Sequence, residues 1–234
     1  SQLQFHTSVE GLDWVKDISQ IRQLLNTGVF MVGFQYNKDN QLGTAGDGLT
    51  TLGRDAAHAV LEYGAVLDLA HAAPQVRADL FAVAEGLGRG NQLCYSHGAV
   101  AGDVTGNPVG ETFFAEHPER FLEKHELRRL LRLRGIVGLT AMKPFFGSPE
   151  RMARQITEVL ELENGPTSLA IGADLGGMHH DSLFDEITEF GHLWRIGDIL
   201  ADKHGVSDEV IDQVLRTNAT RWIASLSSRQ RSLR

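Results

Sequence analysis

The stretch LGRDAAHAVLEYGAVLDLAH, residues 52–71, holds one complete unit of the pattern that decides the fold. Its apolar residues recur at helical spacing as far as Tyr63, and Gly64 follows as a residue type that commonly ends a helix. The next segment, Val66–Leu69, is short and apolar on both faces, which is typical of a strand in a parallel sheet covered by helices. The stretch therefore predicts a helix that leads into a buried parallel strand.

The same alternation of short apolar segments and amphipathic stretches runs along the chain. The predicted strands are Leu3–His6, Val29–Phe34, Val66–Leu69, Leu93–Tyr95, Ile136–Leu139 and Leu169–Ile171. Helical patterns separate them; Pro74 opens one, and Ser148-Pro149-Glu150 opens another with an N-cap and a proline in the first turn. The least regular stretch, Gly98–Pro118, is expected to be a long loop. This alternation predicts the α/β class with a parallel sheet.

A closed barrel of this class needs eight strands and usually about 250 residues. The sequence predicts fewer strands than that, in a chain of 234 residues. We therefore expect a (β/α)8 TIM-type barrel whose N-terminal βα units are missing or altered, with an open doubly wound sheet as the alternative. The open sheet has less support, because no Gly-x-Gly-x-x-Gly follows an early strand. Residues 1–226 are predicted to form this single domain, and residues 227–234 a basic C-terminal tail.

The composition narrows the class of protein. The chain has 234 residues, of which 42% are hydrophobic, enough for one well-buried core. The net charge is −8, and the sequence shows no basic face that could bind a phosphate backbone, so no nucleic-acid partner is expected. No apolar run approaches the roughly 18–20 residues of a membrane span. The single cysteine, Cys94, permits no internal disulfide and fits a cytoplasmic location, unless a signal segment precedes Ser1 in the natural protein.

Three predicted strands are followed within a few residues by a side chain that can bind a metal ion or a proton, namely His71, His97 and Asp174. Because the C-terminal ends of the strands in a parallel barrel meet at one mouth, these side chains are expected to converge there. Two imidazoles and a carboxylate suit a divalent cation such as zinc. Such a cation lowers the pKa of a bound water to about 7, and the carboxylate can accept the proton of that water.

Several motifs, taken in order, resemble those of the membrane (renal) dipeptidase family of the amidohydrolase superfamily. They are Gly48-Leu49-Thr50-Thr51-Leu52-Gly53-Arg54, Asp68-Leu69-Ala70-His71, Tyr95-Ser96-His97, Gly172-Ala173-Asp174-Leu175-Gly176-Gly177, and Glu209 to Trp222 with Asn218 and Arg221. The resemblance covers most of residues 3–225. It implies a barrel fold and a metal-dependent hydrolase, and a homodimer is an expectation by analogy alone.

The resemblance also implies roles for individual residues. His71 and His97 match the two histidines that hold one zinc ion, and Asp174 matches the carboxylate proposed to assist the catalytic water. Arg120 falls where the family has an arginine that binds the substrate carboxylate, a task that suits a planar guanidinium. The resemblance implies a divalent metal as the cofactor. Zinc is the first candidate, and one or two ions are expected.

The sequence departs from the family pattern at three places. The family's first strand carries a His-x-Asp pair for a second zinc, and no such strand is found. The metal-bridging glutamate corresponds to Glu10 or else to Gln4, whose neutral amide bridges two cations poorly and would imply one metal or none. Chemistry favours Glu10. A substrate-binding histidine is replaced by Tyr36, which points to a divergent branch, and Tyr36 and Asn37 are predicted to bind the substrate.

The sequence therefore predicts hydrolysis of a dipeptide or a similar small amide by metal-activated water, and the expected partner is a small peptide-like substrate. If the N-terminal units are missing, the chain alone need not be active. The absent His-x-Asp pair and Tyr36 favour the alternative, a degenerate, non-catalytic barrel that serves as a binding or structural subunit. Bound metal distinguishes the two hypotheses.

Overall fold

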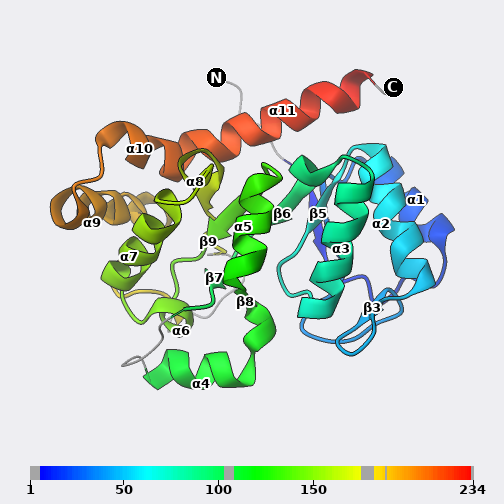
Figure 1. The fold of residues 1–234 in the computed structure, drawn as a ribbon, viewed down its shortest axis with the longest axis horizontal. Coiled ribbons are helices and arrows are strands. Elements are labelled where there is room, and N and C mark those ends of the chain that lie inside the picture. The colour runs from blue at the N-terminus through cyan, green and yellow to red at the C-terminus, as the bar shows by residue number, and fades with distance from the viewer. Residues whose placement is uncertain (1–5, 103–107, 175–181, 188, 233–234) are drawn as a thin grey trace. The chain divides into compact units, whose positions relative to one another are not determined.

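The computed structural model describes residues 6–102, 108–174, 182–187 and 189–232, and it divides into two compact units. The first unit comprises Ser1–Cys94 and Ser225–Arg234, and the second comprises Tyr95–Ala224. The elements of both units are labelled in Figure 1. Among the described residues, no helix is long and apolar enough to span a membrane.

Parallel strands form the centre of the first unit. They are β1 (Ser8–Glu10), β2 (Met31–Gly33), β5 (Val66–Asp68) and the first residues of β6 (Leu93–Tyr95). The register places Glu10, Gly33 and Asp68 side by side at the C-terminal ends of their strands. Cys94 pairs in turn with Asp68. The carboxyl ends of these strands therefore form one edge, which carries two acidic side chains.

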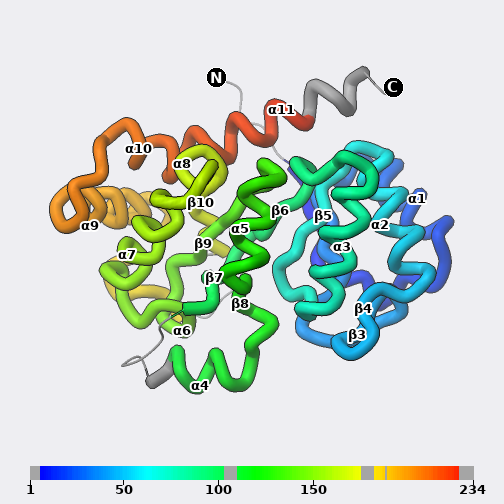
Figure 2. Tube along the Cα trace, in the orientation of Figure 1, coloured from blue at the N-terminus to red at the C-terminus, as the bar shows by residue number. Residues whose placement is uncertain are grey.

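Helices and a short hairpin accompany these strands. The helices are α1 (Ile18–Asn26), α2 (Thr51–Tyr63) and α3 (Pro74–Gly86), the hairpin pairs β3 (Gly43–Thr44) with β4 (Gly48–Leu49), and a 3-10 turn, η1 (Gly90–Gln92), precedes β6. α2 packs between α1 and α3 in Figure 1. The tube in Figure 2 shows the hairpin at one end of α3, against which it packs.

Local sequence signals set the ends of these helices. The side chain of Asp17 accepts a backbone N–H at the start of α1, and that of Thr50 does the same for α2. Gly64 ends α2 with a φ of 89°, a left-handed conformation that glycine adopts at low cost. Pro74 begins α3, where its missing N–H removes no helical hydrogen bond. Of these signals, Gly64 and Pro74 are those from which the helices were predicted.

The second unit contains two parallel pairs of strands, β9 (Ile136–Leu139) with β10 (Leu169–Ile171) and β7 (Ala99–Val100) with β8 (Phe121–Leu122). Its helical elements are α4 (Pro108–Glu116), η2 (Pro118–Arg120), α5 (Lys124–Arg132), α6 (Lys143–Phe146), α7 (Pro149–Leu160), α8 (Gly165–Ser168), η4 (Phe190–His192), α9 (Trp194–His204) and α10 (Asp208–Asp212). A π-helical turn, η5 (Gln213–Thr217), leads from α10 into α11 (Asn218–Ser232).

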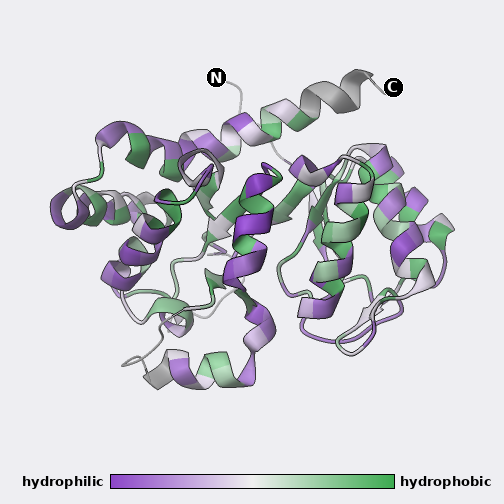
Figure 3. Ribbon diagram, in the orientation of Figure 1, coloured by the Kyte–Doolittle hydropathy of each residue, from purple (hydrophilic) through white to green (hydrophobic). Residues whose placement is uncertain are grey.

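Hydropathy follows burial in the second unit. Every residue of β9 is buried, as both faces of a covered parallel strand require. On α5, Leu127, Leu130 and Leu131 are buried while Arg128 and Arg132 are exposed. Figure 3 shows α5 as alternating green and purple segments, the pattern of a helix with one apolar face. The core of this unit is thus built from strand residues and the inner faces of helices.

The structure confirms the α/β class with parallel strands, and β6, β9 and β10 have the predicted bounds. Two predictions were wrong. The first described strand is Ser8–Glu10 rather than Leu3–His6; His6 belongs to no strand, and residues 3–5 lie outside the described residues. The stretch Gly98–Pro118, predicted to be a loop, contains β7 and α4. Closure into a barrel and the division at residue 226 stay predictions.

Candidate metal centre

His71 follows β5 in a backbone conformation that is unusual for a histidine. Its φ is 59°, in the left-handed region that costs free energy for a residue with a Cβ atom. Buried polar side chains hold the neighbouring backbone: Asp68 Oδ1 accepts the N–H of Ala70 at 3.0 Å, Gln35 Oε1 accepts the N–H of Ala73 at 2.8 Å, and Arg77 donates to the carbonyl oxygen of Ala72 at 2.8 Å. The surrounding contacts therefore fix the direction of the His71 side chain.

Glu10 and His71 form a close pair within the first unit. Nε2 of His71 lies 3.1 Å from Oε1 of Glu10, and the two side chains are 2% and 37% exposed, respectively. A buried imidazole nitrogen beside a partly exposed carboxylate oxygen is a donor set that zinc and similar cations bind. This pairing supports Glu10 as the metal-binding alternative. Gln4, the other alternative, lies outside the described residues.

Tyr36 and Asn37 both contact the imidazole of His71. The ring of Tyr36 stacks on it, with centroids 4.5 Å apart and planes inclined by 27°. Oδ1 of Asn37 lies 2.6 Å from Nδ1 of His71, on the opposite ring nitrogen from the one that faces Glu10. The structure thus places these two predicted substrate-binding residues at the candidate metal ligand, and Tyr36 remains half exposed.

His97 and Asp174 come together within the second unit. His97 follows the end of β6, and its Nε2 lies 4.0 Å from Oδ2 of Asp174. The hydroxyl oxygen of Ser96 lies 2.8 Å from the other ring nitrogen, Nδ1. Asp174 has a φ of 49°, and the carbonyl of the residue before it accepts a hydrogen bond from Thr140. The predicted strand-end histidine and carboxylate are therefore neighbours.

Two glycines allow this close approach. A Cβ atom on Gly138 would lie 2.1 Å from the carbonyl oxygen of Ser96, and one on Gly172 would lie 1.8 Å from the same oxygen. Both distances are shorter than any real Cβ contact, so a side chain at either position would displace the segment that carries His97. The glycines of β9 and of the end of β10 are thus part of the geometry of the site.

Arg120 is the last residue of η2, and it contacts Phe145 and Tyr95. Its guanidinium carbon is 5.6 Å from the ring centroid of Phe145, a cation–π arrangement. Its carbonyl oxygen accepts a hydrogen bond of 2.7 Å from the hydroxyl of Tyr95, the last residue of β6. Its predicted role as the binder of a substrate carboxylate stays a prediction.

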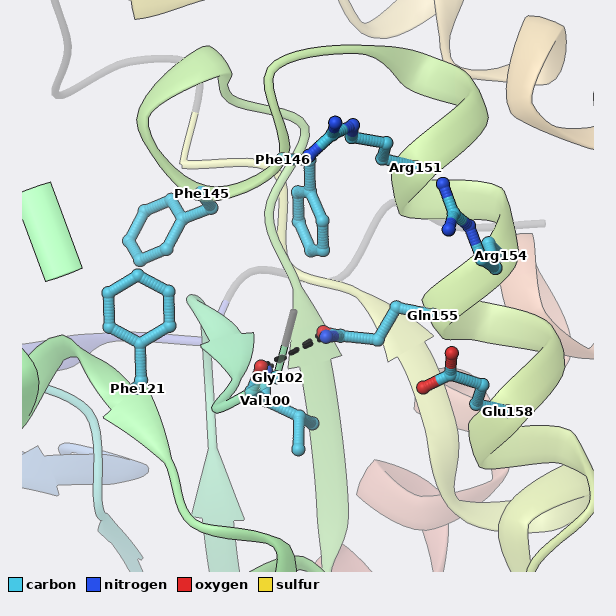
Figure 4. Close-up of a pocket in the computed structure, with 9 residues that line it drawn as sticks. All are labelled: Val100, Gly102, Phe121, Phe145, Phe146, Arg151, Arg154, Gln155 and Glu158. Carbon is cyan, nitrogen blue, oxygen red and sulfur yellow. Dashed lines mark hydrogen bonds between the residues drawn. The ribbon is translucent and has the colours of Figure 1, made fainter. Parts of the chain in front are cut away.

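Gln155 supports the backbone of β7 near His97, a role that was not predicted from the sequence. Its side-chain amide accepts a hydrogen bond from the backbone N–H of Val100 at 2.8 Å and donates one to the carbonyl oxygen of the same residue at 2.9 Å. Figure 4 shows this amide reaching from α7 toward Val100, beside a pocket lined by Phe121 and Phe146. The two bonds join α7 to the backbone of Val100 in β7, three residues after His97. A glutamine in an amphipathic helix gives no sequence signal for such a contact.

Cys94 is not a candidate nucleophile. The thiol is fully buried, and burial raises its pKa well above the ordinary value, with the nearby Asp68 carboxylate adding to the shift. Thiolate is the reactive form, so this cysteine is inert in the folded protein. The chemistry of the site therefore belongs to the histidines and carboxylates.

With this geometry in place, comparison with known proteins is informative. No model of a known protein family matches the sequence, and no curated protein matches it. Solved structures do match. The chain shares its fold with solved metallopeptidases. A metallopeptidase from Rhodobacter sphaeroides, solved with a phosphinate mimic of the dipeptide L-Ala-D-Ala, shares it with a TM-score of 0.75 and 18% identity, over 94% of this chain and 62% of that one.

Two further structures extend this likeness. Dipeptidase AC, a metallopeptidase, matches with a TM-score of 0.75 and 18% identity, over 93% of this chain and 64% of that one. An amidohydrolase from Pseudomonas aeruginosa matches with a TM-score of 0.70 and 20% identity, over 94% of this chain and 71% of that one. The chain therefore spans less than two thirds of the length of the two metallopeptidases. At this identity the likeness establishes the fold, and it supports the dipeptidase resemblance of the sequence motifs.

Proposed function

We propose that this chain is a metal-dependent hydrolase that cleaves a dipeptide or a similar small amide, built on a (β/α)8-type barrel. The observation that carries the proposal is the pair formed by Glu10 and His71, with 3.1 Å between carboxylate oxygen and Nε2, in a metallo-dipeptidase fold. Within the first unit, Glu10 and His71 each offer one ligand atom to a divalent cation. His97 is a further ligand that the sequence motifs imply. Zinc is the first candidate, because a mixed set of imidazole and carboxylate ligands suits it.

Asp174 is the residue proposed to transfer the proton. When bound, the cation supplies a Lewis acid and a water of lowered pKa. Asp174 accepts the proton of the attacking water as the water oxygen bonds to the amide carbon, and it returns that proton to the amine nitrogen as the C–N bond breaks. The Asp174 side chain is 32% exposed and lies 4.0 Å from His97, so it is accessible to a substrate and close to a ligand imidazole.

Two side chains of different chemistry are proposed to bind the substrate. Arg120 carries a guanidinium that can grip the terminal carboxylate of a dipeptide through two parallel hydrogen bonds. Tyr36 is 51% exposed and stacks on His71, so its ring offers an aromatic surface next to the candidate ligand. A tyrosine at this place supports a substrate preference different from that of the dipeptidases whose histidine it replaces.

The test is hydrolysis of L-Ala-D-Ala and related dipeptides, followed by the release of free amine. We expect turnover in zinc-loaded protein, loss of turnover after chelation, and recovery when zinc is restored. The variants His71→Ala and Asp174→Asn should each reduce kcat/KM by at least about a hundredfold, since one removes a ligand and the other the proton acceptor. Intact turnover in metal-free His71→Ala would contradict the proposal.

Matched controls separate these effects from damage to the fold. His58 is an exposed histidine on α2, and Asp198 is an exposed aspartate on α9. His58→Ala and Asp198→Asn remove the same chemical groups away from the candidate site, so both should retain wild-type kcat/KM. Elemental analysis of the purified protein supplies a readout that is independent of the substrate chosen.

A further inference from the structure

Asn37 meets His71 through the ring nitrogen that is turned away from Glu10. Oδ1 of Asn37 lies 2.6 Å from Nδ1, and Nε2 of the same ring lies 3.1 Å from the Glu10 carboxylate. The imidazole is 2% exposed, so water does not compete freely for either nitrogen. The two ring nitrogens of His71 therefore face an amide oxygen and a carboxylate oxygen, respectively.

A neutral imidazole has one N–H group and one lone pair. The Asn37 amide oxygen and the Glu10 carboxylate oxygen can both only accept a hydrogen bond. When a cation binds Nε2, the contact with Asn37 holds the single proton of the ring on Nδ1 and leaves the lone pair of Nε2 for the cation. A metal ligand needs this arrangement, because the lone pair must point to the cation while the other nitrogen donates to a fixed acceptor. Nε2 is also the nitrogen on the side of Glu10, the other candidate ligand of this unit.

The backbone of Asn37 is built for this contact. Its φ is 58°, and asparagine tolerates the left-handed region better than most residues with a Cβ atom. The residues on either side are anchored as well: Tyr36 stacks on His71, and Lys38 forms an ion pair of 2.8 Å with Asp13 in the loop after β1. The Asn37 side chain is therefore held against the imidazole, and its amide oxygen is engaged there.

We propose that Asn37 is a positioning residue that acts through His71: its amide oxygen fixes the Nδ1–H tautomer and the ring orientation, so that Nε2 is presented for metal binding. This role rests on the proposed function and differs from the substrate contact expected from the sequence. Partners of this kind typically contribute a factor of 10–100 to metal affinity.

The test measures zinc affinity by calorimetry in three proteins, namely the wild type, Asn37→Gly and Asn37→Asp. Glycine adopts a φ of 58° without strain, so Asn37→Gly removes the acceptor without a backbone penalty. Aspartate retains an acceptor oxygen at the same place. We expect zinc affinity to fall about 10- to 100-fold in Asn37→Gly and to stay within about threefold of the wild type in Asn37→Asp.

A spectroscopic readout excludes a general loss of structure as the cause. In zinc-loaded wild type, ¹H–¹⁵N correlation of the imidazole should show the proton of His71 on Nδ1, and this signal should be lost or exchange rapidly in Asn37→Gly. Asn26→Gly, an exposed change at the end of α1, is the matched control and should leave affinity and spectrum unchanged.

The possible failures are distinguishable. Wild-type zinc affinity in Asn37→Gly, or a His71 proton on Nε2 in the wild type, would overturn the role of Asn37 and leave the hydrolase intact. A wild-type protein that binds no zinc, manganese or iron would overturn the proposed function, and the role of Asn37 with it.

Discussion

At the scale of single residues, the candidate site depends on backbone strain that its neighbours hold in place. His71 and Asp174 have φ values of 59° and 49°. Each costs about 1–3 kcal/mol for a residue with a Cβ atom, so such conformations persist only where surrounding contacts over-determine them. For His71 those contacts come from buried side chains on three different elements or loops, among them Arg77 of α3. The strain is thus a property of the fold around the ligand.

Arg77 offers a direct test of that support. It is fully buried and donates to the carbonyl oxygen of Ala72, the residue after His71. Arg77→Met keeps the apolar stem but leaves this buried oxygen without that donor, so the free energy of unfolding should fall by about 2 kcal/mol. Urea denaturation measures the change, and Arg22→Met, at an exposed position on α1, should alter it by less than about 0.5 kcal/mol. Equal stability of the two variants would contradict the assigned role.

Cys94 supports a second prediction at this scale. Burial raises the pKa of its thiol, which disfavours the reactive thiolate in the folded protein. The thiol should therefore resist a disulfide reagent such as DTNB under native conditions and react fully in denaturant. Rapid native reaction of one thiol per chain would show that the segment around β6 opens. Cys94→Ala is the blank for this measurement.

The ligands were predictable from the sequence, but their supports were not. His71, His97 and Asp174 each follow an apolar strand, which is a local pattern. Gln35 and Arg77 carry no such mark, because their contacts with the backbone around His71 form only after the chain folds. A supporting residue that lies far from the ligand along the chain cannot be recognised from the sequence, even where the ligand itself can.

At the scale of elements, short strands depend on partners that lie far away in the sequence. β6, β9 and β10 were predicted with the observed bounds, because each is an apolar run. β1 was misplaced: Ser8–Glu10 contains one apolar residue, and its position is set by pairing with β2 rather than by its own pattern. Helix ends were predictable where a residue acts locally, as Gly64 does at the end of α2 and Ser148 at the start of α7.

The two hydrogen bonds from Gln155 of α7 to Val100 of β7 lead to a prediction at this scale. Gln155→Leu removes both hydrogen bonds to Val100 while keeping a side chain of similar size, so the free energy of unfolding should fall by about 1–3 kcal/mol. Because β7 begins two residues after His97, zinc affinity should also fall. Gln23→Leu, an exposed change on α1, is the control for added hydrophobicity. A variant as stable as the wild type would show that these two hydrogen bonds do not stabilise the fold.

At the scale of the whole molecule, two independent observations bear on the fold. Motif order in the sequence and the likeness to solved metallopeptidases agree on the fold, although at 18–20% identity. Each unit holds one pair of candidate residues, Glu10 with His71 in the first and His97 with Asp174 in the second. Strand-end chemistry predicted His71, His97 and Asp174, and the family resemblance implied Glu10 or Gln4. The contact of Asn37 with His71 and the close approach at Gly172 are evident only in three dimensions.

Acid stability is a property of the whole chain, and its direction follows from four carboxyl groups. The pKa values of Asp13, Asp17, Glu150 and Asp212 are lowered, chiefly by hydrogen bonds from Lys38, Ser19, the Glu150 backbone and Thr217, respectively. A folded-state pKa below the unfolded-state value means that the unfolded chain binds more protons in this range. These groups therefore stabilise the fold fully above the ordinary carboxyl pKa of about 4, and their contribution is lost as the pH falls through the lowered values.

We therefore expect the free energy of unfolding to decrease steadily as the pH falls from about 5 to 2, measured by urea denaturation at each pH. Asp17→Asn makes the test specific, because asparagine caps a helix as well as aspartate does but does not titrate. At pH 7 this variant should be nearly as stable as the wild type, and its stability should fall less steeply below pH 4. If the acid slopes of the two proteins coincide, Asp17 does not contribute as a carboxylate, and the acid sensitivity must come from the remaining carboxyl groups.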